Sequence, residues 1–173
     1  MADGEREALY ALRARVFLGE SILRPSGATL LSDDWDEHPA STNLVAVAGG
    51  RVVGGCRGTM TTHGIDAAVS PLFDFRPHLG RDRRLVCLGS WLCLDPDHRG
   101  RTTGLRLVKA VSALASEAGM QTYCAAVRPD ARPLFLRLGW HDLGPPFRHP
   151  VADIGVQPMA RRADSTTING GNQ

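Results

Sequence analysis

Residues 98–104, His-Arg-Gly-Arg-Thr-Thr-Gly, form the segment with the clearest capacity for chemistry. An apolar run at 85–94 precedes it, and apolar residues at helical spacing follow it at 105–119. A strand that passes through a short loop into a helix presents free backbone N–H groups and the positive end of the helix dipole to one small volume. Arginine side chains add charge-assisted contacts to phosphate oxygens. The segment therefore predicts a diphosphate site made by Arg99, Gly100, Arg101, Thr102, Thr103 and Gly104.

The cysteines raise the possibility of a metal site or a reactive thiolate. Cys56, Cys87, Cys93 and Cys124 show no CxxC pair and no Cys/His pair at the spacing of a zinc site. Each lies in an apolar stretch typical of a strand, and buried thiols are usually inert. We expect four buried free thiols and no metal.

Apolar periodicity predicts the elements that position the diphosphate loop. Two apolar runs, 43–48 and 51–57, flank Gly49-Gly50, which predicts a β-hairpin. The nearly continuous apolar run 85–94 predicts a central strand buried on both faces. The remaining expectations are helices at 5–22, 105–119 and 129–137, and strands at 121–127 and 138–143. Residues 61–84 form either a loop over a binding face or a linker, and their length favours a functional loop.

Length and composition fit one globular domain, with 173 residues of which 43% are hydrophobic and 22% charged. We expect the domain to span residues 1–162, and residues 163–173, which end in Gly-Gly-Asn-Gln, to form a disordered tail. The longest apolar runs fall far short of the ~20 residues that a membrane-spanning helix needs. Acidic residues stand near the N-terminus, where a signal peptide is basic and then apolar. The expectation is a cytoplasmic protein without a membrane contact.

The charge distribution excludes few classes of ligand and gives no support for DNA binding. Residues 1–95 hold 10 basic and 12 acidic groups, whereas 96–173 hold 10 and 6, so a polyanionic ligand prefers the second half. The sequence shows no recognition helix and no basic face, and DNA binding has no support.

The diphosphate loop resembles the acyl-CoA pyrophosphate loop of the GNAT superfamily of acyltransferases, whose pattern is Arg/Gln-x-x-Gly-x-Gly/Ala. Arg99 matches the first position and Gly104 the last, while Thr102 stands at the middle glycine. Residues 134–140 resemble the family's aromatic-x-x-Leu-Gly-aromatic segment, and residues 12–17 resemble its opening helix. The resemblance implies an α/β domain with a mixed, mostly antiparallel sheet flanked by helices. It also implies acetyl-CoA or a longer acyl-CoA as co-substrate, with no tightly bound cofactor.

A narrower resemblance is to the acyl-homoserine lactone synthases and N-acyl amino acid synthases, a branch of this superfamily. That branch carries Arg-x-x-Val-Phe, Asp-x-x-Asp and Gly-x-x-Arg, which match residues 13–17, 33–36 and 54–57. The substrate-binding candidates that follow are Arg13, Trp35, Arg57 and Trp91. Two of these have an alternative, since Arg57 either binds an acceptor carboxylate or pairs with Asp34 or Asp36, and Trp91 either walls a pocket or is core.

Three positions depart from these patterns. Leu88 and Trp91 stand where the branch has a Glu and an Arg on the strand before the loop. Phe135 stands where the superfamily often has a Tyr as general acid. The usual acid and base are therefore absent from their usual places, which argues against the homoserine lactone reaction.

Acyl transfer from a thioester to an amine needs a neutral nitrogen, a polarised carbonyl and a proton for the departing thiolate. In the superfamily, the strand before the loop splays from its neighbour and frees backbone N–H groups. The resemblance gives this role to Leu92, Cys93 and Leu94.

The catalytic side-chain candidates are Asp36, Ser90 and Cys124. Asp36 is the candidate base, with a solvated loop or a helix cap as the alternative. Strand alternation turns one of Ser90 and Trp91 toward the site. Cys124, on the strand beside the CoA groove, is a candidate proton donor.

The sequence thus predicts an N-acyltransferase in which a small amine or an amino acid attacks the thioester directly, since no Ser-His or Cys-His pair suggests an acyl-enzyme. An acyl carrier protein or an aminoacyl-tRNA is the alternative donor. A GNAT scaffold that binds a ligand without catalysis is the alternative class. A monomer and a homodimer both fit.

Overall fold

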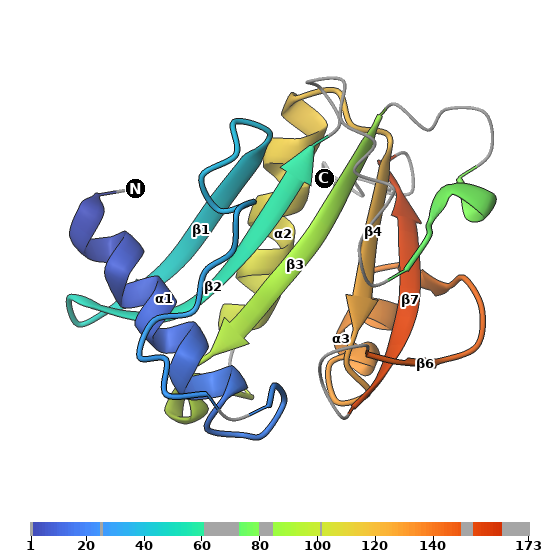
Figure 1. The fold of residues 1–173 in the computed structure, drawn as a ribbon. Helices are drawn as coiled ribbons and strands as arrows, with labels where there is room; N and C mark the ends of the chain where they lie inside the picture. The colour runs from blue at the N-terminus through green and yellow to red at the C-terminus, as the bar shows by residue number, and fades with distance from the viewer. Residues whose placement is uncertain are drawn as a thin grey trace, which may run out of the picture.

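The computed structural model describes residues 2–24, 26–60, 73–79, 85–100, 102–149 and 154–163. In this part of the chain, one seven-stranded sheet carries α1 on one face and α2 and α3 on the other (Figure 1). The strands are β1 (Ser41–Ala48), β2 (Arg51–Met60), β3 (Val86–Leu94), β4 (Thr122–Val127), β5 (His141–Asp142), β6 (Phe147–Arg148) and β7 (Gly155–Arg162). The helices are α1 (Asp3–Phe17), α2 (Thr103–Glu117) and α3 (Arg132–Arg137), with short 3-10 helices η2 (Arg76–His78) and η3 (Pro96–His98).

The strand order is β1-β2-β3-β4-β7-β5, and β6 pairs with β7 off this path. β3 and β4 run parallel, and the other pairs are antiparallel. The expected mixed, mostly antiparallel sheet flanked by helices is confirmed.

The predicted hairpin joins β1 to β2, and its turn residues Gly49 and Gly50 have φ of 56° and 72°, which glycine adopts without strain. Within β2, missing side chains let a helix approach each face of the strand. A Cβ on Gly55 would lie 2.2 Å from Leu9 of α1, and one on Gly58 would lie 2.4 Å from Val111 of α2. β2 is therefore held tightly between α1 and α2.

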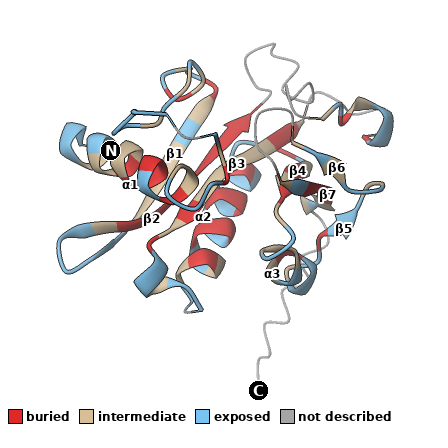
Figure 2. Cartoon of the chain, turned by 60° about the horizontal axis from the view of Figure 1, so that its bottom comes forward, coloured by how far each residue is buried: buried red, intermediate tan, exposed pale blue. Residues whose placement is uncertain are grey.

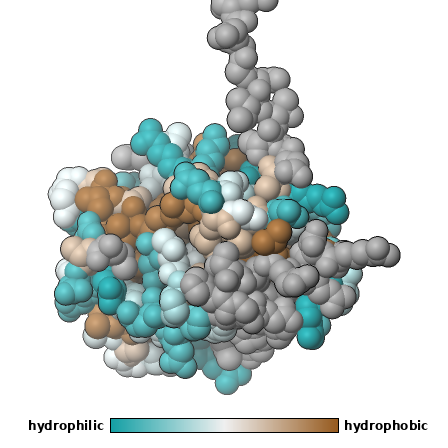
Figure 3. Space-filling view, turned by 90° about the horizontal axis from the view of Figure 1, so that it is seen from above, coloured by the Kyte–Doolittle hydropathy of each residue, from teal (hydrophilic) through white to brown (hydrophobic). Residues whose placement is uncertain are grey.

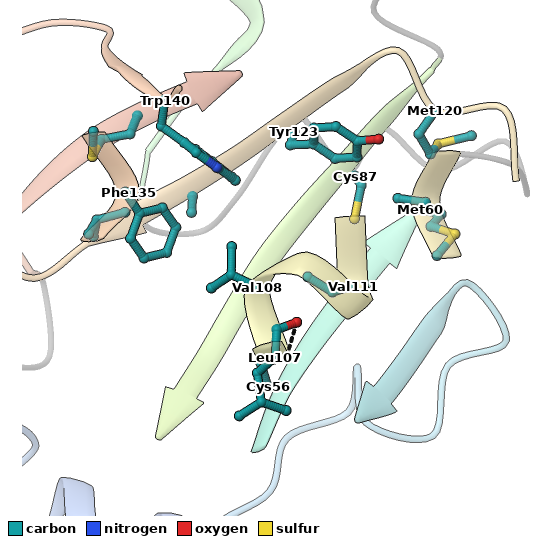
Figure 4. Packing of buried hydrophobic residues seen from close by; sticks show 14 residues of the cluster. Cys56, Met60, Cys87, Leu107, Val108, Val111, Met120, Tyr123, Phe135 and Trp140 are labelled. Atoms are coloured by element: carbon teal, nitrogen blue, oxygen red, sulfur yellow. Dashed lines mark hydrogen bonds between the residues drawn. The ribbon is translucent and has the colours of Figure 1, made fainter. Parts of the chain in front are cut away.

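The largest core cluster fills the space between α2, α3 and the sheet (Figure 4). The inward side of α2 is buried along its length (Figure 2). It contributes Leu107, Val108, Val111 and Ala115 to this cluster, as the helical period of the sequence predicts. A smaller cluster around Leu9 packs α1 on the opposite face.

Two predicted elements differ from the structure in extent. α1 ends at Phe17 rather than near residue 22, because the Leu23 N–H bonds to the Phe17 carbonyl at 2.8 Å and Ser21 has φ +55°. β3 is half-buried over residues 88–92 rather than buried on both faces, because β4 pairs with it only as far as Gly89. Most of the expected loop at 61–84 lies outside the described residues.

β7 is an element that the sequence did not predict. The expected return strand at 138–143 shrinks to β5, and β7 pairs with the whole of β4 instead. Gln157 and Pro158 hide the strand in the sequence, since a proline cannot donate to a sheet and is usually kept out of strand interiors. Here the Pro158 carbonyl accepts from the Leu143 N–H at 2.9 Å, so the neighbouring segment still bonds to it. Ala163, expected to begin a tail, donates its N–H to Gln121 at 2.8 Å; residues 164–173 lie outside the described residues.

The surface mixes apolar and polar groups. On the face seen from above, apolar side chains form a band among hydrophilic ones (Figure 3). The exposed large hydrophobic residues Leu30, Val47 and Leu136 come from three separate segments. Among the described residues, no helix has both the length and the hydropathy to cross a bilayer.

Candidate active site

The site lies where β3 and β4 part. Their parallel pairing runs from Val86 opposite Thr122 to Gly89 opposite Ala125, after which the two strands diverge (Figure 1). A cavity of about 380 Å³ fills the gap. Its walls are residues 89–94 of β3 and the end of β4, and the α1, α2 and α3 helices close it on the two sides of the sheet.

A bulge interrupts β3 beside this cavity. Arg57 of β2 pairs with Ser90, but Gly55 pairs with Cys93, so β3 has one residue more than β2 in this stretch. Trp91 lies in this stretch and has φ +55°, a backbone conformation that favours glycine. A bulge bends its strand, and this one lies just beyond Gly89, where the pairing of β3 with β4 ends.

The bulge also turns two neighbouring side chains to the same face. Ser90 Oγ accepts a hydrogen bond of 3.2 Å from Arg57 Nε, and Trp91 Nε1 donates to Asp33 at 2.9 Å. Phe17 of α1 packs edge-on against Trp91 at 5.2 Å between ring centroids. Our prediction that alternation turns only one of Ser90 and Trp91 to the site is wrong, because a bulge breaks the period of two. Both line the cavity.

Backbone amides of β3 face the gap. The Asp95 N–H bonds to Val53 of β2 at 2.9 Å, and alternate residues of a strand direct their amides to opposite sides. The amides of Leu94 and Leu92 therefore point away from β2, toward the cavity. The Leu94 carbonyl also points away from β2, because it accepts a hydrogen bond of 3.3 Å from Nη2 of Arg99. The amide of Cys93 faces β2, so it does not join Leu92 and Leu94 as we expected.

The predicted diphosphate loop joins β3 to α2 at the mouth of the cavity. Arg99, Gly100 and Gly104 line the cavity. Gly100 has φ +72°, and a Cβ on Gly104 would lie 3.1 Å from Leu94, so each glycine has a local reason. Thr102 has an ordinary φ of −73° and forms the N-cap of α2 without a side-chain capping bond. A glycine is therefore not required there.

The other loop residues differ in position. Thr103 is the first residue of α2 and, like Thr102, is not part of the cavity wall. Arg101 lies outside the described residues. Arg128, at the end of β4, and Arg137, at the end of α3, line the cavity in addition. The sequence shows no local motif that distinguishes these two arginines from surface ones.

A buried network of charges supports the bulge from the side of α1. Arg13 is completely buried, donates to both carboxylate oxygens of Asp36 at 2.8 Å, and donates to Asn43 at 2.7 Å. Arg57 Nη1 lies 3.1 Å from Asp36, and its two Nη groups donate to Asp33. Each of the three guanidinium nitrogens of Arg57 therefore already contacts Asp33, Asp36 or Ser90, which favours the predicted pairing with an acidic loop residue over the binding of an acceptor carboxylate.

The structure corrects three predictions about residues on this side of the sheet. Asp36 is not placed to be a base, because its side chain is 1% exposed and is held by two arginines. Arg13 cannot contact a substrate in this arrangement, because it is completely buried and does not line the cavity. Trp35 is also outside the cavity wall and packs on His38 at 5.0 Å.

Asp33 is the acidic partner that sequence analysis missed; we had named Asp34, which is exposed, and Asp36, whose contact with Arg57 is confirmed. The position of Asp33 at the start of the Asp-x-x-Asp motif was the available signal. Burial raises the pKa of Asp33, but the hydrogen bonds and charge of Arg57 and the bond from Trp91 outweigh burial and lower the pKa below 3.8. The carboxylate therefore stays charged beside the bulge at neutral pH.

Cys124 faces away from the cavity. Its side chain is completely buried in the cluster of Phe75, Leu79, Val86 and Ala160, on the other side of β4. Burial, with a smaller contribution from Cys87, raises the pKa of its thiol to about 12. The structure therefore separates this proton-donor candidate from the reacting groups. All four cysteines are free and buried, as predicted, and the described residues include no cluster of groups that could hold a metal.

Comparison with known proteins gives this arrangement a context. The sequence model of a family described as N-acyl amino acid synthase FeeM matches residues 8–162. No curated protein sequence matches the chain.

Three solved structures illustrate the similarity of fold. A CoA-dependent acyl-homoserine lactone synthase, BjaI, with SAM and isopentyl-CoA, is 25% identical, with a TM-score of 0.65 over 91% of this chain and 75% of that one. FeeM, an N-acyl amino acid synthase from uncultured soil microbes, is 13% identical, with a TM-score of 0.76 over 95% and 88%. A GCN5-related N-acetyltransferase from Kribbella flavida is 21% identical, with a TM-score of 0.61 over 94% of each chain. The expected GNAT fold is confirmed.

Proposed function

Because the chain belongs to the N-acyl amino acid synthase FeeM family, we propose that it transfers an acyl group from acyl-CoA to the amine of a small acceptor, with amino acids as the first class to test. The family and the GNAT fold make the chain an acyltransferase. The acyl-CoA donor is supported by the diphosphate-type loop at the cavity mouth and by isopentyl-CoA in the structure of BjaI.

One observation carries the proposal, namely the cavity between β3 and β4 with donor amides on one wall and a hydroxyl next to them. The donor's diphosphate lies at Arg99 and the start of α2, and its pantetheine arm follows the gap between the strands. The thioester then reaches the bulge, where Leu92 and Leu94 direct their amides into the cavity. Two fixed N–H groups stabilise the oxyanion that forms when an amine attacks the carbonyl.

Ser90 is the group that we assign to proton transfer. During the reaction the C–N bond forms, the C–S bond breaks, the nitrogen loses one proton and the thiolate gains one. Ser90 Oγ already accepts from Arg57 Nε at 3.2 Å, so its own hydrogen is available for another acceptor. Ser90 gives this proton to the sulfur and recovers one from the nitrogen. It thereby takes the place of the tyrosine that Phe135 replaces.

The acceptor reaches the thioester from the side of α1. There the cavity is lined by Phe17, Ser90 and Trp91. Leu88 and Trp91 stand where acyl-homoserine lactone synthases have a Glu and an Arg, which supports an acceptor other than theirs. An acceptor amine that arrives neutral does not have to be deprotonated before it attacks, and Ser90 takes up its proton afterwards, so the buried Asp36 does not have to act.

Calorimetric titration with CoA, acetyl-CoA and a medium-chain acyl-CoA tests the donor, and thiol release with a panel of amino acids tests the reaction. We expect micromolar binding, on the order of −8 kcal/mol, and turnover with at least one amino acid. Binding without turnover against any amine would instead indicate a ligand-binding scaffold. Absence of binding would redirect the search to carrier proteins or aminoacyl-tRNA.

A further inference from the structure

A carboxylate from outside the cavity lies between two arginines of its mouth. Arg99 follows β3 and Arg128 follows β4, so they stand on opposite sides of the gap, and both line the cavity. Arg99 Nη2 donates to Oε1 of Glu20, and Nη1 of Arg128 lies 3.9 Å from Oε2 of the same side chain. Glu20 therefore bridges the two walls, with one oxygen toward each arginine.

Glu20 reaches this position from the turn after α1. Its N–H donates to the Val16 carbonyl at 3.2 Å, and the positive φ of Ser21 then reverses the chain. The side chains of Glu20, Arg99 and Arg128 remain 31%, 38% and 25% exposed. A dissolved anion can therefore reach both arginines and compete for them.

The arrangement suits an anion with several oxygens. Guanidinium groups bind carboxylates and phosphates with the same N–H donors, and charged acceptors make the stronger hydrogen bonds. A diphosphate offers an oxygen to each side of the gap, as the two oxygens of Glu20 do. Glu20 and a diphosphate cannot both occupy these donors, because both are negative and both need the same N–H groups.

We propose that Glu20 is an internal anion that occupies the diphosphate site in the free chain. Arg128 is then a second phosphate-binding residue, which exchanges its contact with Glu20 for one with the diphosphate when the donor binds. The inference rests on the proposed function for the identity of the donor, an acyl-CoA. It adds a way for the site to select its acyl donor, since a thioester that lacks a diphosphate cannot displace Glu20 from the two arginines.

The test compares the wild type with Glu20→Gln, which keeps the size of the side chain and removes its charge. Both are titrated with CoA, with inorganic pyrophosphate and with an acyl-pantetheine that has no nucleotide. We expect Glu20→Gln to bind CoA and pyrophosphate about tenfold more tightly, the scale of one charge-assisted hydrogen bond. Its affinity for acyl-pantetheine should stay unchanged. Arg128→Gln should weaken CoA and pyrophosphate binding alike.

Asp97→Asn is the matched control. Asp97 is an exposed acid two residues before Arg99, and it does not line the cavity. Asp130, which pairs with Arg128 at 2.8 Å, is left unchanged in both variants. If this variant tightens pyrophosphate binding as much as Glu20→Gln does, the effect is a general change of charge and the proposal is overturned. It is also overturned if Glu20→Gln leaves pyrophosphate affinity unchanged or weakens it, since Glu20 would then only orient the arginines.

The pyrophosphate arm separates the two proposals. Pyrophosphate binding that Glu20→Gln tightens, together with no binding of CoA, would contradict the proposed donor and support the anion site. CoA binding that ignores the charge of Glu20 would support the donor and overturn the inference. Absence of pyrophosphate binding in both proteins would overturn the inference as well.

Discussion

Nη1 of Arg13 lies 2.8 Å from each carboxylate oxygen of Asp36, and the two side chains are almost completely removed from solvent. The guanidinium of Arg13 also lies 5.1 Å from the ring centre of Trp91, the residue that forms the bulge. The ion pair therefore connects α1 and the loop before β1 to the strand that shapes the cavity. Its role is to position the site.

Asp36→Asn should lower the free energy of unfolding by about 3–5 kcal/mol, because it leaves two guanidinium groups buried beside a neutral amide. Urea denaturation measures the change. Asp34→Asn, at an exposed neighbouring position, is the control and should stay within about 0.5 kcal/mol of the wild type. Wild-type stability with lost activity would instead make Asp36 a base.

Ser90→Ala should lower kcat by about a hundredfold, the lower range for a general acid, with KM changed little. Steady-state thiol release with a saturating acceptor measures both constants. Cys124→Ala serves as the comparison, and it should keep the wild-type kcat, because the structure places Cys124 outside the cavity. A full kcat in Ser90→Ala would remove Ser90 from the mechanism.

Arg99→Ala should weaken CoA binding about ten- to a hundredfold, since a hydrogen bond to a charged group contributes about 1.5–3 kcal/mol. Part of this loss is offset, because in the variant CoA no longer has to displace Glu20 from Arg99. Calorimetry measures the affinity, and circular dichroism should show an unchanged fold. Arg106→Ala removes the same charge from an exposed position on α2 outside the cavity. Equal weakening by the two variants would count against the loop assignment.

Acidification should remove the contribution of Asp33 to stability. Its pKa in the folded chain is lowered from 3.8, so the charged form is favoured by folding above pH 3.8 and this advantage disappears as the pH falls through the lowered pKa. Unfolding of the wild type and of Asp33→Asn, followed between pH 3 and pH 7, should show a stability difference that is constant near neutrality and shrinks below about pH 4. A difference that does not depend on pH would show that Asp33 acts through its shape alone.

Local signals in the sequence were sufficient for the order of the elements as far as α3 and for the position of the loop between β3 and α2. A Gly-Gly turn between two apolar runs defines the β1–β2 hairpin, and helical spacing after Gly104 defines α2, because both patterns act within a few neighbouring residues. The Arg99-to-Gly104 motif indicated the GNAT fold only together with residues 134–140 and 12–17. No such pattern marks β7, since Gln157 and Pro158 interrupt its apolar face.

The arrangement of the reacting groups was decided by contacts between distant segments. Whether Ser90 and Trp91 share a face depends on the register of β3 against β2, which a strand's own sequence does not contain. Arg57 pairs with Asp33, 24 residues away in the sequence, and Arg99 pairs with Glu20, 79 residues away. The sequence determined which chemistry is available, because motifs are local. The tertiary structure decided which charges are already paired, because pairing depends on the packing of α1 and the loops against the sheet.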